Sequence, residues 1–191
     1  MTVSGSAKIE KNNAANGGGI YVEDVGSGKA NLTGGNISEN NAGSNGGGIY
    51  VSAGDLNLSG NATITQNTAT TKGGGVYYIG GSAKMTVSGN VNITGNTGAD
   101  GNANNVYVPN SNNTNRCYSF EIGEGGLSND AKIGLTYDGT LGLGECIVFA
   151  LHAELGYKDG NFAVDNGGDY SFKVKKNYES GLVISDAVSL Y

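Results

Sequence analysis

The sequence predicts an all-β protein: a parallel β-helix of about four regular coils, with three short strands in each coil and an irregular, β-rich C-terminal cap. Two observations lead to this prediction. A motif recurs every 27 to 30 residues through the first half of the chain, and such a period is typical of solenoids. Glycine makes up 35 of 191 residues, a density that opposes helices.

Each copy of the motif joins an Ile-x-x-Asn segment to an Ile/Val-Tyr pair, with a glycine run between them in the first three copies. The aliphatic residues of the pair lie 29, 27 and 30 positions apart, and a disordered linker has no reason to keep this spacing. These residues are Ile20, Ile49, Val76 and Val106. The repeat therefore indicates stacked coils that share one core.

Three apolar segments per copy alternate with polar residues, as expected for short strands with one buried face. Each coil should contribute four side chains to the interior. The coils must share this interior, because a single coil cannot bury its apolar face alone. The predicted core is Val3, Ile9, Ile20, Val22, Leu32, Ile37, Ile49, Val51, Leu58, Ile64, Val76, Tyr78, Val87, Ile93, Val106 and Val108.

The glycine run precedes the Ile/Val-Tyr strand, where the chain must turn a corner between neighbouring coils. A phosphate-binding loop would need a preceding strand, a following helix and a Lys-Ser/Thr pair, and the pattern lacks this context. The asparagines of Ile-x-x-Asn hold one register and predict a structural ladder, with a polar binding row as the minor alternative. They are Asn12, Asn40, Asn67 and Asn96.

One tyrosine per coil alternates with inward-facing aliphatic residues, so these tyrosines should point outward and stack along one exposed face. Such a face could bind sugar rings or another protein, or it could stiffen the sheet through cross-strand pairs, and both interpretations stay open. The tyrosines are Tyr21, Tyr50, Tyr77 and Tyr107.

Composition divides the chain into residues 1–112, the β-helix repeats, and residues 113–191, irregular coils and a C-terminal β cap. Pro109 and the asparagine-rich residues after it mark a loop at this boundary. A cap is expected because the open end of a β-helix exposes strand edges. Strands are predicted over 117–122, 131–137, 145–151, 170–175 and 181–185.

Cys117 and Cys146 lie 29 residues apart, close to one coil, so a disulfide between them and two unpaired thiols are both open. His152, the single histidine, has no second ligand at zinc spacing. Asp159 and the segment 165–169 lack the twelve-residue calcium loop and are interpreted as turns. We therefore predict no metal site and no cofactor.

The net charge is −6, of which residues 1–112 contribute −1 and residues 113–191 contribute −5. No basic patch suits nucleic acid, and no apolar run approaches a membrane span. The polar N-terminal residues do not form a secretory signal peptide. Because Met1 already lies in a repeat, with residues 1–5 identical to 85–89, we expect an excised piece of a longer exported protein.

The pattern Ile-x-x-Asn…Gly-Gly-Gly-Ile/Val-Tyr-Val, alternating with Leu-x-Leu-x-Gly over residues 1–108, resembles the right-handed parallel β-helix repeats of bacterial cell-surface adhesins. These belong to the pectate-lyase-like superfamily and are similar to autotransporter passengers and polymorphic outer-membrane proteins. Residues 125–136 also resemble the tract that follows such repeats in gut-bacterial surface proteins. The resemblance implies an extracellular location, but this fold carries several functions.

Enzymes of this fold cluster acidic residues with Arg or Lys on one face. Here the coils hold few carboxylates and no Arg, and Glu10 and Glu39 are expected to share a register on a solvated face. We therefore expect a non-catalytic surface module, a stalk or adhesin segment whose partners are host glycan, host protein or other segments of the parent protein. The alternative is a polysaccharide lyase or glycoside hydrolase. An ice- or mineral-binding face is disfavoured, because only Thr63-Ile64-Thr65 has the required pattern.

Overall fold

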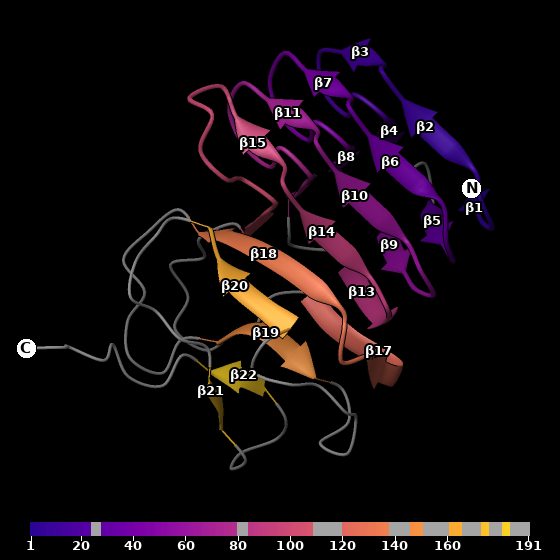
Figure 1. The fold of residues 1–191 in the computed structure, drawn as a ribbon, viewed down its shortest axis with the longest axis vertical. Coiled ribbons are helices and arrows are strands. Elements are labelled where there is room, and N and C mark those ends of the chain that lie inside the picture. The colour runs from indigo at the N-terminus through magenta and orange to yellow at the C-terminus, as the bar shows by residue number, and fades with distance from the viewer. Residues whose placement is uncertain are drawn as a thin grey trace, which may run out of the picture.

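The computed structural model describes residues 1–23, 28–79, 84–108, 120–137, 146–150, 161–165, 173–175 and 181–183. These residues form an all-β fold in which parallel sheets stack as a β-solenoid of about four turns (Figure 1). Each strand of a coil pairs in parallel with the equivalent strand of the next coil. Ile37 and Ile64 are direct partners in this register, so the predicted stacking of like residues over like is confirmed.

Four ladders of strands run along the solenoid (Figure 1). The first contains β1 (Thr2–Val3), β5 (Lys29–Leu32), β9 (Asp55–Leu58), β13 (Lys84–Gly89) and β17 (Phe120–Leu127). The second contains β2 (Lys8–Glu10), β6 (Asn36–Ser38), β10 (Thr63–Thr65) and β14 (Asn92–Thr94). The third contains β3 (Asn13–Ala14), β7 (Asn41–Ala42), β11 (Thr68–Ala69) and β15 (Thr97–Gly98). The fourth contains β4 (Ile20–Val22), β8 (Ile49–Val51), β12 (Val76–Tyr78) and β16 (Val106–Val108).

The prediction of three strands per coil is wrong, because the third ladder adds a fourth strand to each of the first four coils. Its strands are two residues long, too short to show alternation in the sequence. They lie in a projecting segment, here called the arm, that leaves each coil after the second ladder and returns at the fourth. The arm comprises residues 11–19, 39–48, 66–75 and 95–105.

The solenoid continues after the loop predicted near Pro109, which lies outside the described residues. β17 pairs in parallel with β13, and β18 (Lys132–Tyr137) pairs with both β14 and β16. β19 (Cys146–Ala150) pairs in parallel with β17, and β20 (Phe162–Val164) pairs in parallel with β18. The sequence analysis did not predict β20. β22 (Gly181–Val183) pairs antiparallel with β19 and β21 (Lys173–Lys175), a change in direction where the cap was expected.

A single apolar core fills the solenoid. The aliphatic residues at equivalent positions are buried to 0–1% exposure in the second and third coils, among them Leu32, Ile37, Ile49 and Ile64. The predicted core is confirmed except at two positions. Ile9, in the first coil, is only partly buried. The side chain of Val108 lies outside the described part of the structure, so its burial stays a prediction. The stack extends the core into the fifth coil through Ile122, Ile133 and Leu135.

Each of the three positions of the glycine run has a physical reason to be glycine. Gly46, the first, has φ +65°, a left-handed conformation that favours glycine. A Cβ at Gly47 would collide with the backbone carbonyls of Gly74 and Thr68. A Cβ at Gly48 would lie 2.7 Å from the Gly75 carbonyl oxygen and 3.1 Å from Nδ2 of Asn67. The corner predicted for this run is confirmed, and two of its glycines let neighbouring backbones touch.

Candidate functional site

The predicted asparagine ladder joins one coil to the next. The backbone N–H and the Nδ2 of Asn40 both donate to Oδ1 of Asn67, at 2.9 and 3.0 Å. Asn67 in turn donates both groups to Oδ1 of Asn96, at 3.0 and 2.9 Å. Asn40, Asn67 and Asn96 are almost fully buried, whereas Asn12 at the first coil is exposed.

From the second coil to the fourth, each ladder amide also donates to a backbone carbonyl of the coil before it. Nδ2 of Asn67 donates to the carbonyl of Ile37 at 2.9 Å, and Nδ2 of Asn96 donates to that of Ile64 at 2.8 Å. One side chain therefore bonds to both neighbouring coils. Because an unpaired buried polar group is costly, removal of one asparagine leaves several groups unsatisfied at once.

A left-handed residue directs each asparagine into the stack. The residue before the asparagine has φ of +60° at Lys11, +55° at Glu39, +57° at Gln66 and +67° at Gly95. The first three of these residues are not glycine, so the turn carries a conformational cost of about 1 kcal/mol in each of the first three coils. The buried hydrogen bonds of the ladder offset that cost.

Two residues that the sequence analysis did not assign to the ladder complete it. The backbone N–H and Nδ2 of Asn96 donate to Oδ1 of Asn105, at 3.0 and 2.9 Å. Asn105 donates its own N–H and Nδ2 to the two carboxylate oxygens of Asp165, at 2.6 and 2.7 Å. The Thr136 hydroxyl donates to the same carboxylate at 2.7 Å.

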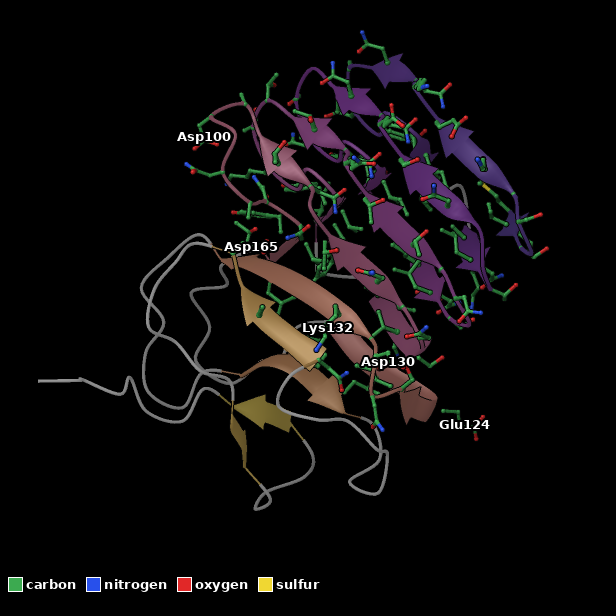
Figure 2. All side chains as sticks on the ribbon, in the orientation of Figure 1. Asp100, Glu124, Asp130, Lys132 and Asp165 are labelled. Atoms are coloured by element: carbon green, nitrogen blue, oxygen red, sulfur yellow. The ribbon has the colours of Figure 1, made fainter. Side chains whose placement is uncertain are left out.

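The end of the ladder lies where β20 ends, and Figure 2 shows Asp165 at this place. Gly134 occupies the fifth-coil position between Asn105 and Asp165, and a Cβ there would collide with both side chains. From one ladder side chain to the next, every hydrogen bond is donated in the same direction, toward the C-terminal coils. The last side chain of the ladder therefore only accepts. A carboxylate, which only accepts, suits that position.

The tyrosine row forms a continuous stack. Ring centroids lie 5.0 Å apart for Tyr21 and Tyr50, 5.3 Å for Tyr50 and Tyr77, and 5.3 Å for Tyr77 and Tyr107. Neighbouring planes differ by 15 to 24°. The rings therefore cover one another's faces and present mainly edges and hydroxyls to the solvent.

Exposure along the tyrosine row is uneven. Tyr21 is 48% exposed, Tyr50 and Tyr77 are partly buried, and Tyr107 is only 5% exposed. The expectation of an exposed strip is therefore wrong at Tyr107, whose hydroxyl accepts a hydrogen bond from Nζ of Lys72 at 2.8 Å. The same Nζ lies 4.6 Å from the ring centroid.

Burial raises the pKa of Tyr50, and the neighbouring phenols of Tyr21 and Tyr77 raise it further. Both causes act against the phenolate, since a charge in this stack would lose water and face two further hydroxyls. The position thus favours the neutral form of Tyr50.

The carboxylates of the coils do not gather on one face. The shared register expected for Glu10 and Glu39 is wrong: Glu10 pairs with Ser38, and Glu39 instead faces Lys11, with 3.9 Å between Nζ and Oε2. Asp55 forms an ion pair with Lys29 at 3.2 Å.

The remaining carboxylates are separated as well. Figure 2 shows Asp100, Asp165, Asp130 and Glu124 on different elements of the molecule. The side-chain amide of Asn102, and then its backbone N–H, hydrogen-bond to Asp100 and hold the pKa of its carboxyl below the usual value. In the described part of the chain, no group of three or more His, Cys, Asp or Glu side chains could hold a metal ion.

Several predicted features fall on residues that the structure does not describe. Cys117 and His152 are among them, and only the backbone of Cys146 is described, in β19, so the disulfide stays a prediction. Asp159 also lies outside the described residues, as do the residues that follow Asp165 up to position 172. Within the described ranges, no helix is long and apolar enough to span a membrane.

The chain matches no protein-family model, no curated protein and no solved structure.

Proposed function

We propose that the chain is a non-catalytic structural module of a bacterial cell-surface protein, in which the stacked coils form a rigid stalk. The observation that carries the proposal is the ladder, whose buried asparagines bond to the coils on both sides. Repeat proteins depend on such nearest-neighbour contacts, because each unit is stabilised mainly by the units next to it. A stalk needs this kind of bond, which resists both sliding and separation of its coils.

The pattern of repeated residues supports a scaffold over a catalytic module. Aliphatic, asparagine, glycine and tyrosine positions recur, and each meets its own equivalent in the next coil. The surface location is supported by the resemblance of the glycine-tyrosine repeat to those of surface β-helices, and by a net charge of −6 without a basic patch.

Single-molecule force spectroscopy tests the stalk directly. The full chain is held at both ends and stretched, and the wild type should unfold coil by coil at a well-defined force. Asn67→Ala should lower that force, while Lys8→Ala on the exposed part of β2 should leave it unchanged. Equal forces for Asn67→Ala and the wild type would contradict the proposal.

The tyrosine row supports a second candidate function, the binding of a host glycan or protein. Tyr21 is 48% exposed, and the edges of Tyr50 and Tyr77 reach the surface of the same sheet. Tyrosine contributes large contact area at low cost in side-chain entropy, so it is frequent in binding surfaces. Ring faces are already stacked on one another, so a ligand would contact edges and hydroxyls.

A glycan and mucin array tests this second function with the full chain. Tyr50→Ala and Tyr77→Ala should each reduce binding by roughly tenfold if the row is the contact surface. Lys8→Ala is the control, because Lys8 is exposed and lies in β2, outside the strand ladder that carries the tyrosines. Binding that is unchanged in both tyrosine variants would exclude the row as the ligand surface.

The same fold is compatible with a carbohydrate-active enzyme, and assays distinguish this alternative. Activity on acidic polysaccharides that disappears in Glu39→Gln or Asp55→Asn would favour an enzyme over the stalk. We expect no activity, since each carboxylate is engaged by a lysine on its own face, Lys11 and Lys29 respectively.

A further inference from the structure

The first coil exposes the half of the ladder that every later coil uses to bind its predecessor. Oδ1 of Asn40 accepts the backbone N–H and Nδ2 of Asn12, at 3.0 and 2.9 Å, and Asn67 accepts the same pair of groups from Asn40. Asn12 holds this position in the first coil. Among the described residues, no donor reaches its Oδ1.

The backbone of the arm shows the same asymmetry. The N–H groups of Gly17 and Gly18 donate to the carbonyls of Asn45 and Gly46, each at 3.1 Å. In the next coil, Gly46 donates to the carbonyl of Lys72 at 3.0 Å. The carbonyls of Asn16 and Gly17 occupy the equivalent positions in the first coil, and no N–H of the described residues donates to them.

Apolar surface accompanies these polar groups. One face of the Tyr21 ring stacks on Tyr50, and the side chain stays 48% exposed. Val3 and Val22 are 7% exposed, compared with 1% for the equivalent residues of the second coil, Leu32 and Val51. The first coil therefore presents an aromatic ring and backbone acceptors, beside core side chains that are slightly more exposed than those of the second coil.

We propose that this surface, which we call the leading face, binds a further coil of the same repeat in parallel register. We identify the occupant as a coil because the same asparagine and tyrosine contacts recur at each of the three junctions between the first four coils. An asparagine above Asn12 would supply two N–H donors to one oxygen, and a tyrosine above Tyr21 would cover its ring at the observed spacing of about 5 Å. The inference rests on the stalk function proposed above, because it identifies how the stalk is extended.

The test fuses a second copy of residues 1–28 ahead of Met1 in the full chain. Backbone amides of β2 and β4 in the original first coil should then exchange with deuterium at least about tenfold more slowly. A matched fusion carries Asn12→Ala and Tyr21→Ala in the added copy only. It keeps the length and the aliphatic core, and it should give less protection than the unmodified fusion.

Unchanged exchange in both fusions would overturn the inference, and the stalk would still stand if Asn67→Ala lowers the unfolding force. Sedimentation of the unfused chain gives an independent reading. A monomer is expected, since the leading face accepts a parallel strand, whereas two leading faces related by a twofold axis would meet with antiparallel strands. A concentration-dependent dimer that protects β1 to β4 would overturn the inference, because a second copy would then be the occupant.

Discussion

The first four coils and the fifth share one core but differ in the arm. In the fourth coil, Ile93 and Val106 lie 13 positions apart, and the arm fills the interval. In the fifth coil, the equivalent residues Ile133 and Leu135 are separated by Gly134 alone, and β18 runs straight through (Figure 1). Both residues of the fifth coil are still 1% exposed.

This difference shows that the core does not need the arm, whereas the ladder does. Without an arm, the fifth coil cannot supply a ladder asparagine of its own. Asn105 occupies the position that the third glycine of the run holds in the earlier coils. In those coils, a side chain at this position would lie too close to the ladder asparagine of the following coil. Asp165 then follows as the final acceptor. The replacement of glycine by asparagine in the fourth copy therefore marks the end of the arms.

The largest expected effect comes from removing the middle of the ladder. Asn67→Ala removes the acceptor of the Asn40 N–H and Nδ2 and the donor to the Ile37 carbonyl. Oδ1 of Asn96 keeps only the backbone N–H of residue 67. The free energy of unfolding in urea should fall by roughly 4 kcal/mol. Asn12→Ala at the exposed end is the control and should cost less than about 1 kcal/mol. Equal losses would mean that burial does not set the strength of the ladder.

Gly47→Ala should be next, because a methyl group in the arm would collide with two backbone carbonyls of the following coil. The coils must separate locally, and unfolding should become easier by about 3 kcal/mol. Gly5→Ala is the control: its Cβ would meet nothing within 4 Å, and only its φ of +61° opposes the change. A smaller loss at Gly47 than at Gly5 would show that the arm can widen.

A change in the armless coil should have a smaller effect. Gly134→Ala would push the side chains of Asn105 and Asp165 apart and cost about 2 kcal/mol, since side chains yield more easily than backbone. Asn105→Gly restores the residue type of the earlier coils at this position. In a double-mutant cycle, part of the loss should disappear in the Gly134→Ala, Asn105→Gly variant. Strict additivity would contradict the contact.

The smallest effect concerns the tyrosine row. Because the folded state raises the pKa of Tyr50, the unfolded chain loses its phenol proton first as the pH rises above about 10. The stability contributed by the neutral phenol is fully present below that pH and declines above it. Ultraviolet titration of the phenolate should show Tyr50 moving toward its ordinary pKa in Tyr77→Phe. A pKa that stays unchanged would leave burial and Tyr21 as the causes.

The repeat in the sequence was sufficient to predict the parallel stack, the core and the asparagine ladder. Each is a short pattern copied at a fixed period, so alignment of the copies identifies equivalent positions such as Ile37, Ile64, Asn40 and Asn67. The third ladder was missed because its two-residue strands carry no alternation. Glu10 was assigned to the wrong register because one position of offset is easy to mistake in so short a segment.

The end of the ladder could not be predicted from the repeat. Asn105 and Asp165 lie 60 positions apart, and Asp165 belongs to no copy of the motif. The hydrogen bond from Lys72, in the preceding coil, to the Tyr107 hydroxyl likewise joins residues at different positions of the repeat. Neither contact leaves a periodic signal in the sequence.

The sequence by itself therefore determined which residues are equivalent and which side of each strand is apolar, because periodicity and alternation are local properties. Only the tertiary structure decided where the arms stop, which carboxylate receives the last hydrogen bonds and how much of each tyrosine remains exposed. The physical reason is that these outcomes depend on which neighbour a coil has, and an end has a neighbour unlike the others.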